Sequence, residues 1–143
     1  MIEQRAACLQ YARGRVDARA RWRHRGRSPL SMDCVGLVWL SLRAAGLDIA
    51  DSKNYSREPW RDHPRAQLRA RFGDPIPETE WQPGDIAVFK SPNRGPAHIG
   101  LLADYAHGGF ALIHAHAQHN VTEHALDARW RRLLIEVYSP WAI

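Results

Sequence analysis

Residues 33–47 read DCVGLVWLSLRAAGL, and this stretch decides how the rest of the chain folds. The Asp33 side chain can cap a helix, the residues that follow are almost all apolar, and Gly46 suits a helix end. The pattern predicts a buried central helix with Cys34 in its first turn. Free backbone N–H groups and the helix dipole favour a thiolate at that position, although a lone buried cysteine can also be a simple core residue.

The length of 143 residues fits one domain, which we expect to span residues 1–143 and to bury roughly two-thirds of its unfolded surface. The first residues are charged and polar rather than an apolar signal segment, and no apolar run approaches the ~18 residues of a membrane span. We therefore expect cytoplasmic synthesis without a signal peptide, and no membrane insertion. In that reducing compartment Cys8 and Cys34 are expected to be free thiols, with Cys8 in the core.

The net charge of +5 is unevenly distributed. Seven arginines lie between Arg13 and Arg27, and four of them alternate in the stretch RWRHRGR at residues 21–27. This alternation with aromatic residues could bind an anionic ligand, or it could be a solvated loop. Zinc-finger spacing and a glycine-rich phosphate loop are absent, so the sequence gives no further support for nucleic-acid binding.

Helical patterns dominate the first half of the chain and strand patterns the second. Helical spacing predicts helices over residues 3–16 and 64–72, and we expect the arginine-rich segment up to Ser31 to be a loop. Four later segments have strand length and many β-forming residues: 85–90, 97–103, 110–116 and 133–138. A helical turn is expected around residues 127–130. Short links between consecutive strands predict an antiparallel sheet, and hence an α+β fold with helices on one face of it.

The chain has eight histidines, and five of them lie between His107 and His124. The spacing of His114, His116 and His119 would allow a zinc site, because residues i and i+2 of a strand point to the same face. HExxH and CxxC pairs are absent, and a solvated histidine-rich edge explains the same pattern. Zinc is therefore the weaker interpretation.

A cysteine nucleophile needs a base within hydrogen-bonding reach and a third group that orients the base. The helix dipole contributes only ~0.3–1 kcal/mol, which is less than the ~1.4 kcal/mol needed to lower a pKa by one. A nearby imidazolium would have to supply the rest. His98 begins one predicted strand and His114 ends another, and antiparallel neighbours can place such ends side by side. The spacing therefore allows a site of Cys34, His98 and His114.

Four motifs follow one another along the chain: DCVGL at residues 33–37, PGDIAVF at 83–89, HIGLL at 98–102 and LIHA at 112–115. Together, from about Arg21 to Tyr138, they resemble the NlpC-type cell-wall peptidases, a family with a papain-like α+β fold. The resemblance implies cleavage of peptidoglycan stem peptides, commonly at the bond between γ-D-glutamate and the diamino acid. It also implies Cys34 as the nucleophile, His98 as the general base and His114 as the residue that orients His98, with no metal or cofactor.

The same resemblance gives a role to residues near the cysteine. A tyrosine often lines the family's site upstream of the nucleophile, and Trp22 stands at that position with an indole N–H but no hydroxyl. We expect Trp22, Asp33 and His24 to line the oxyanion and substrate region, with the backbone N–H of Cys34 available for the oxyanion hole. His24 and His116 could equally be surface residues.

Arg23 and Arg25 would bind the free carboxylates of a stem peptide. A catalytic domain of this size, with an arginine-rich segment before the cysteine, is similar to the subgroup encoded with phage tails, prophages or gene transfer agents. We therefore expect a virion component with tail or hub proteins as partners, which acts on the cell wall. Two alternatives stay open: a structural tail component or adaptor with weak or vestigial activity, and a papain-fold amidase or acyltransferase with another substrate.

Overall fold

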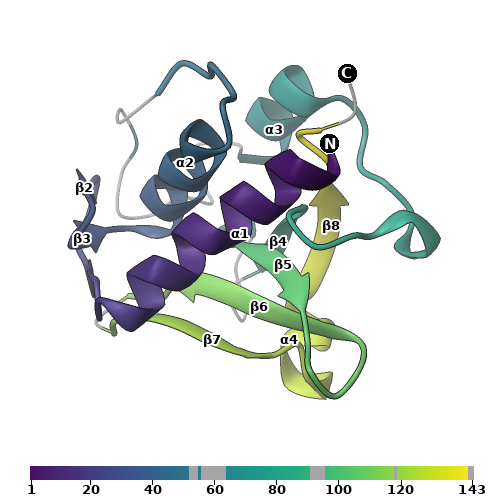
Figure 1. Cartoon of the computed structure of the whole chain (residues 1–143). Helices are drawn as coiled ribbons and strands as arrows, with labels where there is room; N and C mark the ends of the chain where they lie inside the picture. Colours follow the sequence, from purple (N-terminus) through teal and green to yellow (C-terminus); the bar gives the residue numbers. More distant parts are fainter. Residues whose placement is uncertain (52–54, 56–63, 91–95, 118, 142–143) are drawn as a thin grey trace.

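A computed structural model of the chain describes residues 1–51, 55, 64–90, 96–117 and 119–141. Helices α1 (Ile2–Asp17) and α2 (Cys34–Ala44) pack together over one face of a five-stranded sheet, and α3 (Pro64–Phe72) joins the same core (Figure 1). The short helix α4 (Ala128–Leu133) packs against the opposite face. The α+β fold, with helices first in the chain and an antiparallel sheet after them, is confirmed.

The five strands lie in the order β7-β6-β5-β4-β8, and every neighbouring pair is antiparallel. Their bounds are Ile86–Lys90 (β4), Pro96–Asp104 (β5), Phe110–Ala115 (β6), Val121–Ala125 (β7) and Leu134–Tyr138 (β8). Successive residues of a strand point to opposite faces. Ile86 and Val88 thus join the core under the helices, whereas Ala87 and Phe89 join a second apolar cluster on the side of α4.

Helix α2 forms where the sequence predicted the central helix. Asp33 is its N-cap, and the Asp33 carboxylate accepts a hydrogen bond of 2.8 Å from the backbone N–H of Gly36. The helix ends at Ala44, and Gly46 follows with a positive φ of 93°, a conformation that glycine adopts without strain. Leu37 and Leu42 are buried between α1 and the sheet, so the apolar side of α2 anchors Cys34 at its first turn.

The arginine-rich segment differs from the predicted loop. It forms a small sheet of two-residue strands in the order β1-β3-β2, with β1 at Arg21–Trp22, β2 at Arg27–Ser28 and β3 at Ser31–Met32. The backbone N–H of Trp22 also donates to the carbonyl of His119, at 3.1 Å. Two-residue strands carry no readable alternation, which is why the sequence pattern did not predict them.

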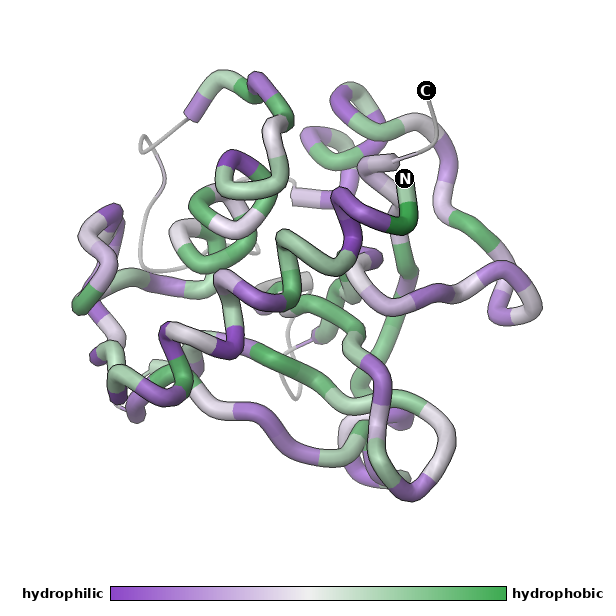
Figure 2. The backbone as a smooth tube through the Cα atoms, viewed as in Figure 1, coloured by the Kyte–Doolittle hydropathy of each residue, from purple (hydrophilic) through white to green (hydrophobic). Residues whose placement is uncertain are grey.

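Strand β7 was not predicted from the sequence. It pairs with β6 along its whole length, from Ala111 opposite Ala125 to Ala115 opposite Val121. It is an edge strand, and Val121 is its one buried residue. Figure 2 shows the same contrast, because the central strands are mostly hydrophobic whereas β7 is largely hydrophilic. A polar edge strand gives little hydrophobic signal.

Among the residues that the structure describes, no helix is both long enough and apolar enough to cross a lipid bilayer.

Close contact at Gly36 generates a stability prediction. A Cβ atom added at Gly36 would lie 2.2 Å from the carbonyl oxygen of Gly26, so the arginine-rich segment and α2 would have to separate. We expect Gly36→Ala to lower the free energy of unfolding by about 1–3 kcal/mol, measured by chemical denaturation.

Gly14→Ala in α1 is the matched control, because a Cβ atom there meets nothing within 4 Å. This substitution is expected to raise stability by about 0.5–1 kcal/mol through helix propensity. Equal changes in the two variants would contradict the close contact at Gly36.

Candidate active site

The site begins at the buried carboxylate of Asp33, which is only 4% exposed. Besides capping α2, it accepts a 2.7 Å hydrogen bond from the backbone N–H of Arg25 and a 3.1 Å bond from the Arg27 guanidinium. The hydroxyl of Tyr55 donates to the same carboxylate. These contacts fix the first turn of α2 and therefore the position of Cys34. Asp33 was expected to line the site; it is buried at the start of α2, immediately before Cys34 in the chain.

Cys34 is a free, half-buried cysteine. Burial raises the pKa of its thiol to about 12, and the neighbouring Asp33 carboxylate acts in the same direction. Hydrogen bonding to the backbone amides of Ile99, Val35 and Cys34 itself opposes this shift. Because Ile99 directly follows His98, the sulfur lies at the end of β5 that carries this histidine.

Three histidines lie side by side on β5, β6 and β7, and we call His98, His114 and His124 the histidine row. Nε2 of His98 lies 2.7 Å from Nδ1 of His114. Nε2 of His114 lies 2.8 Å from Nε2 of His124, and Nδ1 of His124 lies 2.8 Å from the carbonyl oxygen of Ala125. The structure thus brings His98 and His114 together, as the strand pattern predicted, and adds His124, which the sequence reasoning missed together with β7.

The first two members of the histidine row are electrically neutral groups in this environment. Burial, with a smaller effect of the His116 ring, lowers the pKa of His98 to about 3. Burial and the neighbouring histidines lower the pKa of His114 to about 2. The expected activation of Cys34 by an imidazolium is therefore wrong for the resting site: desolvation disfavours both the thiolate and the imidazolium. Burial was the property that the sequence could not supply.

Trp130 of α4 covers the histidine row. Its ring centroid lies 4.8 Å from that of His114, 5.5 Å from His124 and 6.1 Å from His98. The ring of His116 lies 5.7 Å from both His98 and His114, so this residue borders the row although its side chain is exposed. The indole keeps water away from the row on that side, which contributes to the desolvation of the imidazoles.

Tyr55 supplies a hydroxyl that sequence reasoning did not find. It donates to Asp33 and accepts a 3.0 Å hydrogen bond from the Arg27 guanidinium, and burial raises its pKa. The ring of His24 lies 5.6 Å from Tyr55 and 6.3 Å from Trp22, so these three aromatic residues form one group beside the Asp33 carboxylate. Tyr55 lies in a polar stretch without periodicity, and nothing in the sequence pattern distinguished it.

Arg23 and Arg25 are both exposed, but they differ in their contacts. The guanidinium of Arg25 donates two hydrogen bonds, of 2.9 Å and 2.7 Å, to the carbonyl oxygen of Tyr55. Arg25 therefore has a structural contact in addition to any role with a substrate. Substrate binding by Arg23 and Arg25 stays a prediction.

The residues described do not form a metal centre. Within residues 1–51, 55, 64–90, 96–117 and 119–141, no group of three or more histidine, cysteine, aspartate or glutamate side chains could hold a metal ion. In the histidine row, both ring nitrogens of His114 and of His124 and Nε2 of His98 are hydrogen-bonded to one another or to the Ala125 carbonyl.

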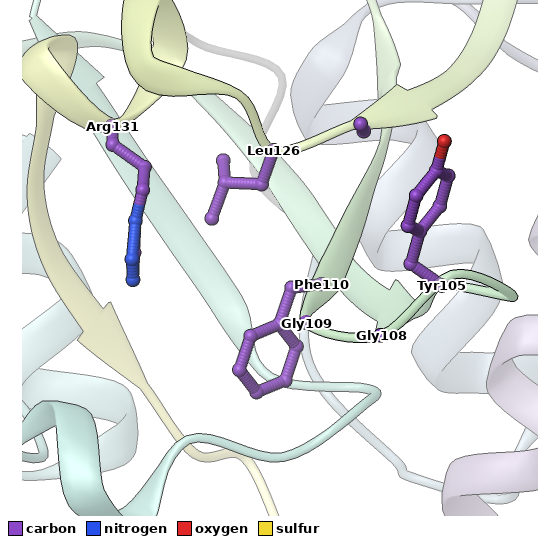
Figure 3. A pocket seen from close by; sticks show the side chains of 7 residues that line it. Tyr105, Gly108, Gly109, Phe110, Leu126 and Arg131 are labelled. Atoms are coloured by element: carbon purple, nitrogen blue, oxygen red, sulfur yellow. The ribbon is translucent and has the colours of Figure 1, made fainter.

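A separate pocket of about 220 Å³ lies at the start of β6, whereas His114 is near the end of that strand (Figure 3). It is lined by Tyr105, Gly108, Gly109, Phe110, Ala125, Leu126 and Arg131. Among the described residues that line this pocket there is no cysteine, histidine or carboxylate, which are the groups of a nucleophilic site.

Cys34 lies at a helix N-terminus, its sulfur is hydrogen-bonded to the backbone amide of the residue that follows His98, and His98 is hydrogen-bonded to a second imidazole. A thiol and a buried imidazole are the groups that nucleophilic acyl transfer requires. The sequence pattern of the NlpC/P60 family matches residues 19–138, which is most of the chain. The chain belongs to the NlpC/P60 family. No curated protein sequence matches it.

Solved structures of NlpC/P60 proteins share the fold. An NlpC/P60 family protein from Bacillus cereus ATCC 10987 is 15% identical with a TM-score of 0.70; the alignment covers 96% of this chain and 40% of that one. This chain thus spans less than half of that protein. The NlpC/p60 domain of the peptidoglycan hydrolase SagA is 20% identical with a TM-score of 0.62, and the alignment covers 94% of this chain and 97% of that domain.

RipD from Mycobacterium tuberculosis is described as a non-catalytic NlpC/p60 domain protein adapted to peptidoglycan binding. It is 12% identical with a TM-score of 0.59, and the alignment covers 95% of this chain and 96% of that one. NlpC/P60 domains therefore include proteins without catalytic activity.

The neutral resting site generates a prediction about pH. Only the thiolate reacts with iodoacetamide, and with a thiol pKa of about 12 its fraction rises tenfold for each pH unit. We expect the alkylation rate of Cys34 to rise about tenfold per unit from about pH 6 to about pH 9, without a plateau. The rate is followed by mass spectrometry of the intact protein.

Cys34→Ala is the control, because the remaining Cys8 is buried and its pKa is also raised to about 12. A rate that is already constant near neutral pH would instead indicate a thiolate and imidazolium pair.

Proposed function

We propose that this NlpC/P60 protein is a cysteine peptidase that hydrolyses peptidoglycan stem peptides. Membership of the family suggests a peptidoglycan hydrolase. The observation that carries the proposal is the placement of Cys34 at the N-terminus of α2, against the backbone amide that follows His98, with His98 hydrogen-bonded to His114. This arrangement supports a nucleophile on α2 and a base on β5 that is held by a second imidazole, which are the groups that covalent catalysis uses.

In the proposed reaction Cys34 is the nucleophile and His98 is the general base. As the sulfur attacks the scissile carbonyl carbon, His98 accepts the thiol proton, and the carbonyl oxygen becomes negatively charged. The backbone N–H of Cys34 would stabilise that oxygen. His98 then gives its proton to the leaving amine, which departs and leaves a thioester. Water, deprotonated by His98, hydrolyses the thioester and restores the thiol.

The neutral resting state fits this order of events. Since His98 carries no proton on the nitrogen that faces the thiol in the proposed reaction, it can accept one when the attack begins. His114 would hold the imidazole in place and stabilise the transient positive charge on His98 through their 2.7 Å hydrogen bond. The proposed bond is that between γ-D-glutamate and the diamino acid, where exposed Arg23 would attract a free carboxylate.

A second candidate function is that of a structural component or adaptor, which binds peptidoglycan and has weak or vestigial activity. The observation that favours it is the burial that raises the pKa of Cys34 to about 12, since a neutral thiol is a poor nucleophile. RipD provides an example of a non-catalytic domain with this fold. A papain-fold amidase or acyltransferase with another substrate is the third reading, because it would use the same nucleophile and base.

Digestion of purified peptidoglycan tests these functions. We expect the protein to release stem-peptide fragments, identified by mass spectrometry, and Cys34→Ala to lower the rate by at least about a thousandfold because the covalent path is lost. Cys8→Ala is the control for a cysteine outside the site. Equal release by the wild-type protein and Cys34→Ala would refute the catalytic assignment, and binding without release would support the adaptor.

We also propose that the protein is a phage-tail or gene-transfer-agent component that helps a particle to cross the cell wall. The support is the resemblance of its arginine-rich segment to that subgroup and the exposure of Arg21, Arg23 and Arg25, which offer a cationic surface to a partner protein. Tail or hub proteins would be the partners, and the particle would be the location of the mature protein.

Co-expression with tail proteins from the same locus, followed by size-exclusion chromatography, tests the particle role. Co-elution that is lost in a variant with Arg21, Arg23 and Arg25 replaced by serine is the expected result. Separate elution of the wild-type protein from every tail protein would refute it.

A further inference from the structure

His124 has no assigned part in the proposed reaction, yet it completes the histidine row. It lies on β7 opposite Leu112 of β6, with a half-buried side chain. Its Nε2 contacts Nε2 of His114 at 2.8 Å, and its Nδ1 contacts the carbonyl oxygen of Ala125 at 2.8 Å. Both of its ring nitrogens are therefore engaged, one by a side chain and one by the backbone.

The Ala125 carbonyl determines where the protons of the row lie. A carbonyl oxygen can only accept, so Nδ1 of His124 must carry its proton and donate it. In the neutral form of His124 the other nitrogen is an acceptor, so Nε2 of His124 then accepts from Nε2–H of His114. By the same rule Nδ1 of His114 accepts from Nε2–H of His98. Nδ1 of His98 then carries no proton, and its lone pair can accept one.

We propose that His124 is a positioning residue that fixes the tautomer of His98, so that Nδ1 of His98 is the atom that accepts the proton of Cys34. This inference rests on the proposed cysteine peptidase function and extends it by one residue. His124 acts through His114 and touches neither the thiol nor the substrate. The Ala125 carbonyl on the edge strand sets the tautomer of His124, and the two hydrogen bonds between rings then set the tautomers of His114 and His98.

The packing around His114 prevents the row from rearranging. His114 is 2% exposed, and a Cβ atom at the facing Gly100 would lie 3.0 Å from its Cβ. Trp130 covers the other side, with its centroid 4.8 Å from that of His114. Burial also lowers the pKa of His98 and of His114, so each of these rings is neutral and carries one proton. Each ring can then donate one hydrogen bond and accept one.

Nuclear magnetic resonance can read the tautomers directly. Long-range ¹H–¹⁵N correlation of the imidazole rings in the full-length protein distinguishes a protonated ring nitrogen from an unprotonated one. We expect protonated Nε2 in His98 and His114 and protonated Nδ1 in His124. A proton on Nδ1 of His98, or on Nε2 of His124, would overturn the proposal without any variant.

Two substitutions separate positioning from mere packing. His124→Gln keeps an acceptor near the position of Nε2, whereas His124→Leu fills similar space without one. We expect His124→Leu to lower kcat on peptidoglycan by about tenfold to a hundredfold, with KM changed less than about twofold. His124→Gln should recover most of the lost kcat. His107→Leu, an exposed histidine beside Tyr105, is the control and should change neither.

The readouts also separate this proposal from the proposed function. The tautomers are measured without substrate, so they test His124 even if peptidoglycan is not cleaved. Unchanged tautomers of His98 and His114 in a folded His124→Leu variant would overturn the positioning role, as would equal losses in the Gln and Leu variants. Mixed tautomers of His98 in His124→Leu, with one form restored in His124→Gln, would support it.

Discussion

The buried carboxylate of Asp33 is the group on which the placement of Cys34 depends. Its two oxygens accept hydrogen bonds from four donors: the amides of Gly36 and Arg25, the Arg27 guanidinium and the Tyr55 hydroxyl. A buried charge is tolerated only when it is paired and hydrogen-bonded. These contacts therefore stabilise the folded chain, and they also fix the position of the first turn of α2. Through them the helix start, the arginine-rich segment and Tyr55 form one unit around the thiol.

The candidate site is built from a helix, which carries the cysteine, and from a sheet, which carries the histidines. The helical half presents the sulfur from α2, and the sheet half presents the histidine row from three adjacent strands. The backbone amide of Ile99 links them, because it reaches the sulfur from the strand that carries His98. The Trp130 ring covers the histidine row on one side, and charges that develop beside a buried, apolar ring interact more strongly than they would in water.

The sequence predicted those parts that local chemistry determines. Asp33 and Pro64 mark helix starts, and the antiparallel strand pattern correctly brought His98 and His114 together. It could not predict β7, because an edge strand such as Val121–Ala125 needs few apolar residues, and His124 was missed with it. Tyr55 was missed because its contacts are long-range. The charge state expected for the thiol was wrong because desolvation depends on tertiary packing, which no local pattern reveals.

The edge strand β7 is held by residues that come much earlier in the chain. Arg13 of α1 pairs with Glu123 at 2.9 Å, across 110 positions of sequence, and the backbone N–H of Val121 donates to the carbonyl of Ala20. Contacts of such sequence separation close large loops and slow the folding of a domain. The strand that carries His124 is thus completed by contacts with the first twenty residues, so the histidine row depends on the first and last thirds of the chain being packed together.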